Sequence, residues 1–130
     1  MNTHYLWLSP DRFEELVEEA LDEIPDTLWN MIDNVGIVVE DWPSPAQLAS
    51  VNIKHATQLL GLYQGIPVTK RDTHYGLIAP DKISLFRGPI LMMTFQNEDA
   101  VREQVRRTVL HEIAHFFGIS DQRLRELGAY

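Results

Sequence analysis

The sequence has no cysteine among its 130 residues. Disulfide bonds and thiolate metal sites are therefore excluded, and histidine and carboxylate side chains remain as the available metal ligands. Basic residues are also scarce, because 11 Lys and Arg stand against 19 Asp and Glu, which gives a formal net charge of -8. This charge argues against nucleic acid and against an anionic membrane surface as the main binding partner.

Two kinds of hydrophobic segment are missing as well. The N-terminal residues 1–8 have no basic region and no long apolar run, so they do not resemble a signal peptide, and no segment is long enough to cross a bilayer. A cytoplasmic location is therefore expected. With 45% hydrophobic and 23% charged residues, the composition suits a single domain over residues 1–130.

Two long helices are predicted from capping residues and apolar spacing. Ser9-Pro10-Asp11 is a strong helix start, and apolar residues then recur at helical spacing until Pro25 ends the segment. Asn97-Glu98-Asp99 begins a second helix whose apolar positions recur every four residues up to Phe117. A short helix over residues 121–127 is expected to follow.

The strand predictions are less uniform. Residues 35–40 are β-branched and nearly continuously apolar, which favours a central strand, and residues 59–68 read as a strand that runs into a turn. Residues 83–93 contain two apolar runs around Pro89, which has no N–H for a ladder. An edge strand, bend or hairpin is expected there, with Met92 and Met93 filling the core and an edge that could bind an extended peptide or a second copy.

Residues 69–81 form the longest stretch with no regular pattern. Loops of this kind often carry binding residues, and His74 and Tyr75 are candidates for donating a proton or hydrogen bond to a substrate. An ordinary loop role is the more economical interpretation of both residues.

The most informative stretch is HEIAHFFGISD at residues 111–121, which has the pattern HExxHxxGxxD. His111 and His115 are four residues apart, so a helix brings both imidazoles to one metal ion, with Glu112 on the adjacent surface. Gly118 can take the positive φ that ends a helix, and the turn gives Asp121 a route to the same metal. Three protein ligands and one open position are typical of a catalytic rather than a structural zinc site.

This ligand set favours Zn²⁺ over other divalent ions. Glu112 is then the candidate general base, taking a proton from a water molecule that attacks an amide carbonyl and passing it to the leaving amine. The plain alternative is a surface helix that happens to carry two histidines, and the specificity of the five-residue pattern argues against it.

The motif, together with LLGLYQGIPVTKR and DKISLFRGPIL before it and RLRELGAY after it, resembles the minimal zincin-like family of small bacterial neutral zinc metallopeptidases. The resemblance extends from Phe13 onward. It implies an α+β domain with a small mixed sheet packed against an N-terminal helix and the HExxH helix. It also implies zinc held by His111, His115 and Asp121, Glu112 as catalytic base, and a peptide or protein substrate.

The same motif is similar to that of snapalysin-type secreted proteases, but one feature departs from metzincin-type peptidases. Those enzymes have a methionine-containing turn after the motif, whereas no methionine follows Asp121 here. A wall of any substrate cleft must then come from another part of the chain.

Two other functions remain open. One is a non-catalytic or partner-dependent zinc-binding regulatory module. The other is a nuclease resembling the small three-histidine ribosome-maturation proteins, which Glu112, Asp121 and the acidic charge all oppose. The sequence leaves the substrate and the oligomeric state undetermined.

Overall fold

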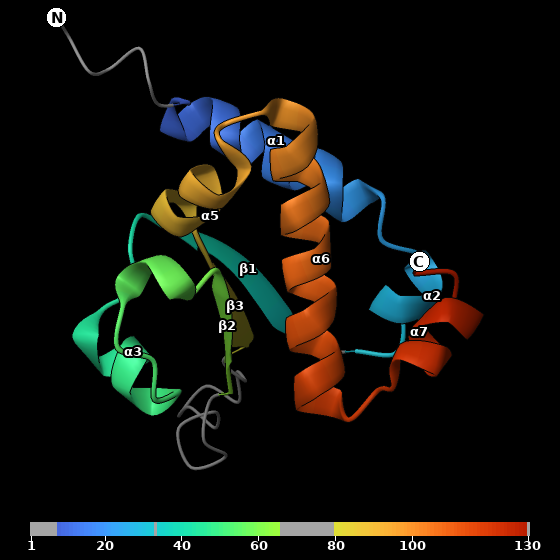
Figure 1. The fold of residues 1–130 in the computed structure, drawn as a ribbon. Helices are drawn as coiled ribbons and strands as arrows, with labels where there is room; N and C mark the ends of the chain where they lie inside the picture. Colours follow the sequence, from blue (N-terminus) through green and yellow to red (C-terminus); the bar gives the residue numbers. More distant parts are fainter. Residues whose placement is uncertain (1–7, 33, 66–79, 130) are drawn as a thin grey trace, which may run out of the picture.

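The first long helix starts and ends where its capping residues require. The computed structural model describes residues 8–32, 34–65 and 80–129 (Figure 1). Helix α1 (Pro10–Asp22) begins with the Ser9 side chain accepting a hydrogen bond from the Arg12 N–H, and with Pro10 at the first helical position. Its buried stripe faces the core. The other elements are α2 (Asp26–Trp29), β1 (Val35–Glu40), α3 (Pro45–Ser50), the 3-10 helix η2 (Ala56–Gln58), β2 (Gly61–Gln64), β3 (Asp81–Phe86), α5 (Arg87–Thr94), α6 (Glu98–Phe117) and α7 (Asp121–Glu126).

The three strands form a mixed sheet in the order β1-β3-β2. Strand β1 pairs with β3 in parallel, with Val35 opposite Asp81, and β2 pairs with β3 antiparallel, with Gly61 opposite Leu85. Because β3 lies in the middle, β2 has one edge that no described strand covers. The α+β class and the small mixed sheet expected from the sequence are confirmed.

Two strand predictions are wrong. The segment 35–40 is a strand, but it lies at an edge of the sheet, and the central strand is β3. The segment expected as an edge, bend or hairpin is instead the central strand followed by helix α5. Pro89 is tolerated in that helix because it lies in the first turn, where the N–H has no intrahelical partner.

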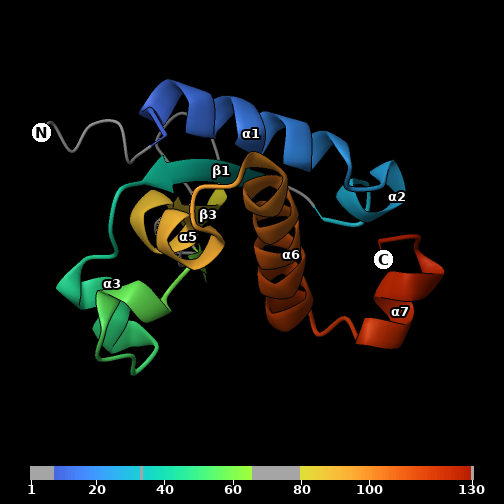
Figure 2. The same cartoon turned by 45° about the horizontal axis from the view of Figure 1, so that its top comes forward.

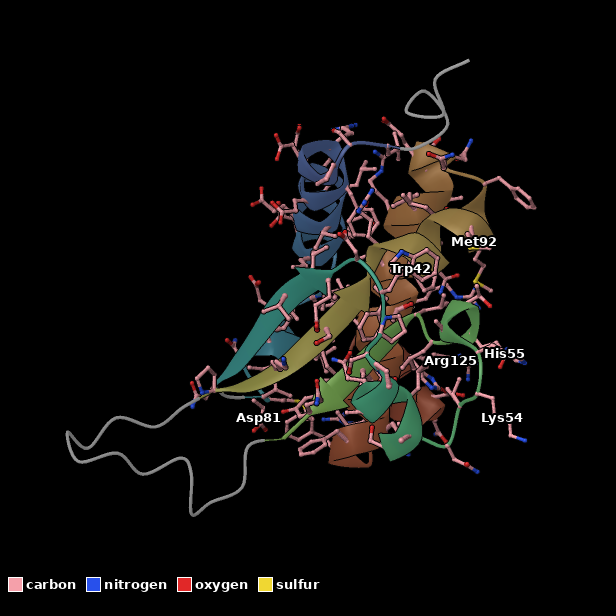
Figure 3. All side chains as sticks on the ribbon, turned by 90° about the vertical axis from the view of Figure 1, so that its left-hand side faces the viewer. Trp42, Lys54, His55, Asp81, Met92 and Arg125 are labelled. Atoms are coloured by element: carbon pink, nitrogen blue, oxygen red, sulfur yellow. The ribbon has the colours of Figure 1, made fainter. Side chains whose placement is uncertain are left out.

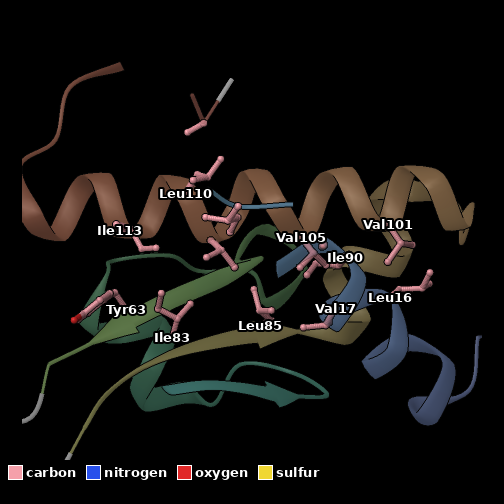
Figure 4. Close-up of a cluster of buried hydrophobic side chains, with 14 of the residues drawn as sticks. Leu16, Val17, Tyr63, Ile83, Leu85, Ile90, Val101, Val105, Leu110 and Ile113 are labelled. Atoms are coloured by element: carbon pink, nitrogen blue, oxygen red, sulfur yellow. The ribbon is translucent and has the colours of Figure 1, made fainter. Parts of the chain in front are cut away.

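The core lies between one face of the sheet and the pair α1 and α6. Figure 4 shows Ile113 of α6 directed toward Ile83 of β3, with Leu16 and Val17 of α1 close to the other end of α6. These side chains are buried. A smaller cluster of Leu59, Leu62 and Phe86, with Leu48 and Ile53 packed against it, covers the opposite face of the sheet beside α3. The sheet therefore holds α6 on one side and the α3–η2 segment on the other.

Helix α5 presents apolar side chains to solvent. Met92 and Met93 are 48% and 59% exposed, so the expectation that they fill the core is wrong. Met92 projects outward from α5, whereas Trp42 covers the start of that helix (Figure 3). In the described ranges, no helix combines the length and the apolarity that crossing a membrane requires.

Candidate active site

Helix α6 carries the HExxH motif in its last two turns. The Asn97 side chain caps its start by accepting from the Ala100 N–H, and Glu98 and Asp99 lie in its first turn. The helix ends at Gly118, whose φ of 67° and ψ of 33° are left-handed, with the Ile119 N–H donating to the Ala114 carbonyl. This is the glycine-ended helix that the sequence predicted.

The two histidines of the motif lie one turn apart on this helix. Their ring centroids are 6.4 Å apart and the rings are tilted by 42°. Both side chains, His111 and His115, are exposed and line the same cavity. Two imidazoles on one tetrahedral zinc, each bonded at about 2.1 Å, would have centroids about 5 Å apart, so the two rings must come closer together to bind one ion.

Glu112 is held by the sheet. Its Oε1 accepts a hydrogen bond of 2.9 Å from the backbone N–H of Tyr63 in β2. Its other carboxylate oxygen has no hydrogen bond to any residue in the described parts of the chain. One oxygen is therefore fixed toward the edge strand and the other remains available at the cavity.

Tyr63 is fixed by two further contacts. Its hydroxyl donates to Asp81 Oδ2 over 2.7 Å in a buried pair, and its ring stacks on Phe116 with centroids 3.9 Å apart. The strand residue that binds Glu112 is thus anchored to β3 and to α6 at once. Sequence reasoning missed Tyr63, because its contribution to the site comes from a backbone N–H that any residue would carry.

The cavity has a volume of about 880 Å³ and runs along α6 between β2 and the segment after α3. Helix α6 contributes Gln104, Arg107, Thr108, His111, Glu112, His115 and Phe116. Gly61, Leu62 and Tyr63 come from β2, Val51, Ile53, Gln58, Leu59 and Leu60 from the segment before it, and Met93 from α5. Its walls are therefore apolar on one side and polar along the helix.

Asp121 is placed elsewhere. It is the first residue of α7, which Ser120 caps by accepting from the Arg123 N–H, and it does not line the cavity. Figure 1 shows α7 on the side of α6 away from β2, and Figure 2 shows it on the side of α6 away from β3. Buried Leu124 fixes α7 there, and the Thr27 hydroxyl donates to the Leu127 carbonyl.

The donors fit a metal only in part. His111, His115 and Glu112 meet at one cavity, and neither imidazole is engaged in a hydrogen bond with a described residue. Over the described ranges, however, no group of three His, Asp or Glu side chains is close enough to hold an ion. Asp121 as third ligand therefore stays a prediction, and His74 and Tyr75 lie outside the described residues.

The comparison with known families agrees with the motif and its cavity. The family model of the Zincin-like metallopeptidases matches residues 32–129, about three quarters of the chain. The chain belongs to this family. The match includes β1, β2, β3 and the whole of α6, and so covers every element that lines the cavity. No curated protein matches the chain. The family is one of zinc-dependent hydrolases.

Proposed function

We propose that this chain is a zinc-dependent peptidase in which Glu112 is the general base. The observation that carries the proposal is that Glu112 lines the same cavity as His111 and His115, whose imidazoles make no hydrogen bond to a described residue. His111 and His115 would hold the metal, with Asp121 as the third ligand. When bound there, zinc supplies a Lewis acid for the scissile carbonyl and lowers the pKa of a water molecule.

The proton transfers belong to Glu112. Its free oxygen takes a proton from water as the water oxygen bonds to the carbonyl carbon. The same proton then passes to the amide nitrogen while the C–N bond breaks, which leaves a carboxylic acid and an amine. The Tyr63 N–H holds the other oxygen, so the carboxylate needs little reorientation between the two steps.

The cavity also favours an extended peptide over other hydrolase substrates. The Phe86 N–H donates to the Leu60 carbonyl, so Leu60, just before β2, and Phe86 of β3 form a hydrogen-bonded pair. Such pairs occur at every second residue of an antiparallel ladder, so the backbone N–H and C=O groups of Leu62 and Gln64 also point toward β3. The backbone groups of Gly61 consequently point toward the open edge that lines the cavity. A peptide strand could add to this edge and bring a carbonyl to Glu112.

The test is hydrolysis of a quenched-fluorescence peptide library by protein loaded with one equivalent of zinc. Glu112→Gln should retain bound zinc, measured by mass spectrometry of metals, and lose at least about a hundredfold in kcat. Glu126→Gln, a change at an exposed carboxylate of α7, is the matched control and should keep full activity.

Turnover that persists in Glu112→Gln would contradict the mechanism. Bound zinc with no Glu112-dependent turnover of any library peptide would instead support the non-catalytic regulatory module.

A further inference from the structure

An arginine that pairs with no residue in the described part of the chain lies in the wall of the cavity, one helical turn before the HExxH motif. Arg107 is exposed and lines the cavity together with His111. It has neither an ion pair nor a hydrogen bond with any residue that the structure describes. The neighbouring arginines differ, because Arg106 pairs with Glu103 and Arg102 pairs with Asp99 and Glu19.

Arg107 has no ion pair with a described residue although the formal net charge of the chain is -8. Glu103 lies one turn before Arg107 and makes its bidentate pair with Arg106. The hydrogen bond from Arg106 lowers the pKa of Glu103, and the charges of Arg106 and Arg107 lower it further. Arg107 therefore lines the cavity, and none of its N–H donors is bonded to a residue in the described ranges. A planar guanidinium is matched best by a carboxylate, which it can bind through two parallel hydrogen bonds.

The direction of β2 indicates where such a carboxylate would lie. Gly61 approaches Thr108, whereas Tyr63 contacts Glu112 and Gly65 lies against Phe116, so β2 and α6 run the same way along the cavity. A peptide that pairs antiparallel with β2 then runs from the Phe116 end toward the Thr108 end. Its C-terminal part arrives at Arg107.

The spacing of Arg107 and His111 along α6 suits a carboxylate that lies a short distance beyond the cleaved bond. Four helical residues separate Arg107 from His111, about 6 Å along the axis. An extended peptide covers this length in about two residues. Apolar side chains of Leu59, Leu60 and Met93 line the same end of the cavity and suit apolar residues just before the carboxylate.

We infer that Arg107 binds the free C-terminal carboxylate of a short peptide, about two residues beyond the bond that is cleaved. This inference rests on the proposed peptidase function and narrows its substrates to peptides with a free C-terminus near the scissile bond. The residue is a specificity determinant and takes no part in proton transfer.

The binding test uses Glu112→Gln protein, with and without one equivalent of zinc, so that no probe is hydrolysed. The probes are dansyl-Gly-Leu-Leu as the free acid and as the C-terminal amide, and their Kd values are measured by dansyl fluorescence. The acid should bind about tenfold more tightly than the amide. Adding Arg107→Gln should remove this preference, Arg107→Lys should keep part of it, and Arg123→Gln should leave it unchanged.

Three results would each overturn the inference. They are equal binding of the acid and the amide, no detectable binding of the acid at millimolar concentration, and a preference for the acid that survives Arg107→Gln. Hydrolysis assays with Glu112 intact separate it from the proposed function. Turnover of peptides without any acid preference contradicts the role of Arg107 and leaves the peptidase intact. If the protein binds the acid more tightly in an Arg107-dependent way but hydrolyses no peptide, the role of Arg107 is supported and the peptidase function is contradicted.

Discussion

The contact between β2 and α6 is the packing feature on which the site depends, and Gly61 is where it can be tested. A β-carbon at Gly61 would lie 2.6 Å from Thr108 Cγ2 and 3.1 Å from the carbonyl oxygen of Ser84. The first distance is too short for any real contact, so Gly61→Ala must displace either β2 or the Thr108 side chain. Overpacking of this kind costs about 2 kcal/mol of unfolding free energy.

The size of the effect can be isolated with two further variants. Gly36→Ala is the control for the general glycine-to-alanine effect in a strand, because its added carbon meets only the Asp81 carbonyl oxygen at 3.9 Å. Thr108→Ser removes Cγ2 but keeps the hydroxyl that accepts from Gln104, and alone it should cost about 1 kcal/mol. Combined with Gly61→Ala, it should recover at least about 1 kcal/mol.

Urea unfolding followed by circular dichroism gives all four free energies. A Gly61→Ala protein as stable as Gly36→Ala would refute the tight packing of β2 on α6. So would a double variant whose losses simply add, because the clash with Thr108 would then not be the cause.

Three further outcomes follow from other contacts. Gly118→Ala should lower the unfolding free energy by about 1 kcal/mol, because φ at this residue is 67°. Gly118→Asn should lower it by less, because asparagine tolerates the left-handed region. Equal losses of unfolding free energy in urea titrations would contradict this. The hydrogen bond from Arg12 lowers the pKa of Glu98, so the carboxylate stabilises the fold above its unfolded pKa near 4.5. The difference in Tm between wild type and Glu98→Gln should therefore be present at pH 7 and vanish as pH falls through the lowered pKa; a difference that grows in acid would contradict it. Gly88→Ala should displace the half-exposed Trp42 ring, 2.5 Å from the added carbon, and change tryptophan emission, whereas an unchanged spectrum would show that the ring does not lie there.

Helices were predictable from the sequence because their signals are local. Ser9 and Asn97 accept the capping hydrogen bonds that their positions indicate, and Gly118 ends α6. The short helix after it begins at Asp121, as expected. In each case a side chain satisfies a backbone group within three or four residues, so the sequence alone contains the necessary information.

The order of strands and the identity of α5 were not predictable in this way. Residues 35–40 are as apolar as a central strand because α1 and α6 cover one face of the sheet, although β1 lies at the edge. The apolar run 90–93 has no period that separates a buried helix from a strand. Pro89, read as a strand breaker, is equally compatible with the first turn of a helix.

In the candidate site, too, some features were predictable from the sequence and others were not. The spacing of His111, Glu112 and His115 on one helix predicts their shared cavity, which the structure bears out. The contributions of Tyr63 and Arg107 depend on which strand lies against α6, and this is a tertiary fact. The sequence marks Arg107 only as one of several arginines on the solvent-facing side of a helix.

The most direct measurement of the central claim is a crystal structure of the zinc-soaked protein with an anomalous difference map at the zinc absorption edge. The account predicts one peak within about 2.1 Å of a side-chain nitrogen of both His111 and His115. For Asp121 to be the third ligand, its carboxylate must also move from its place at the start of α7 to a similar distance from the peak. The account also predicts Glu112 beside the peak without being a ligand. A map with no peak at the two histidines, or with zinc bound only elsewhere on the chain, would contradict it.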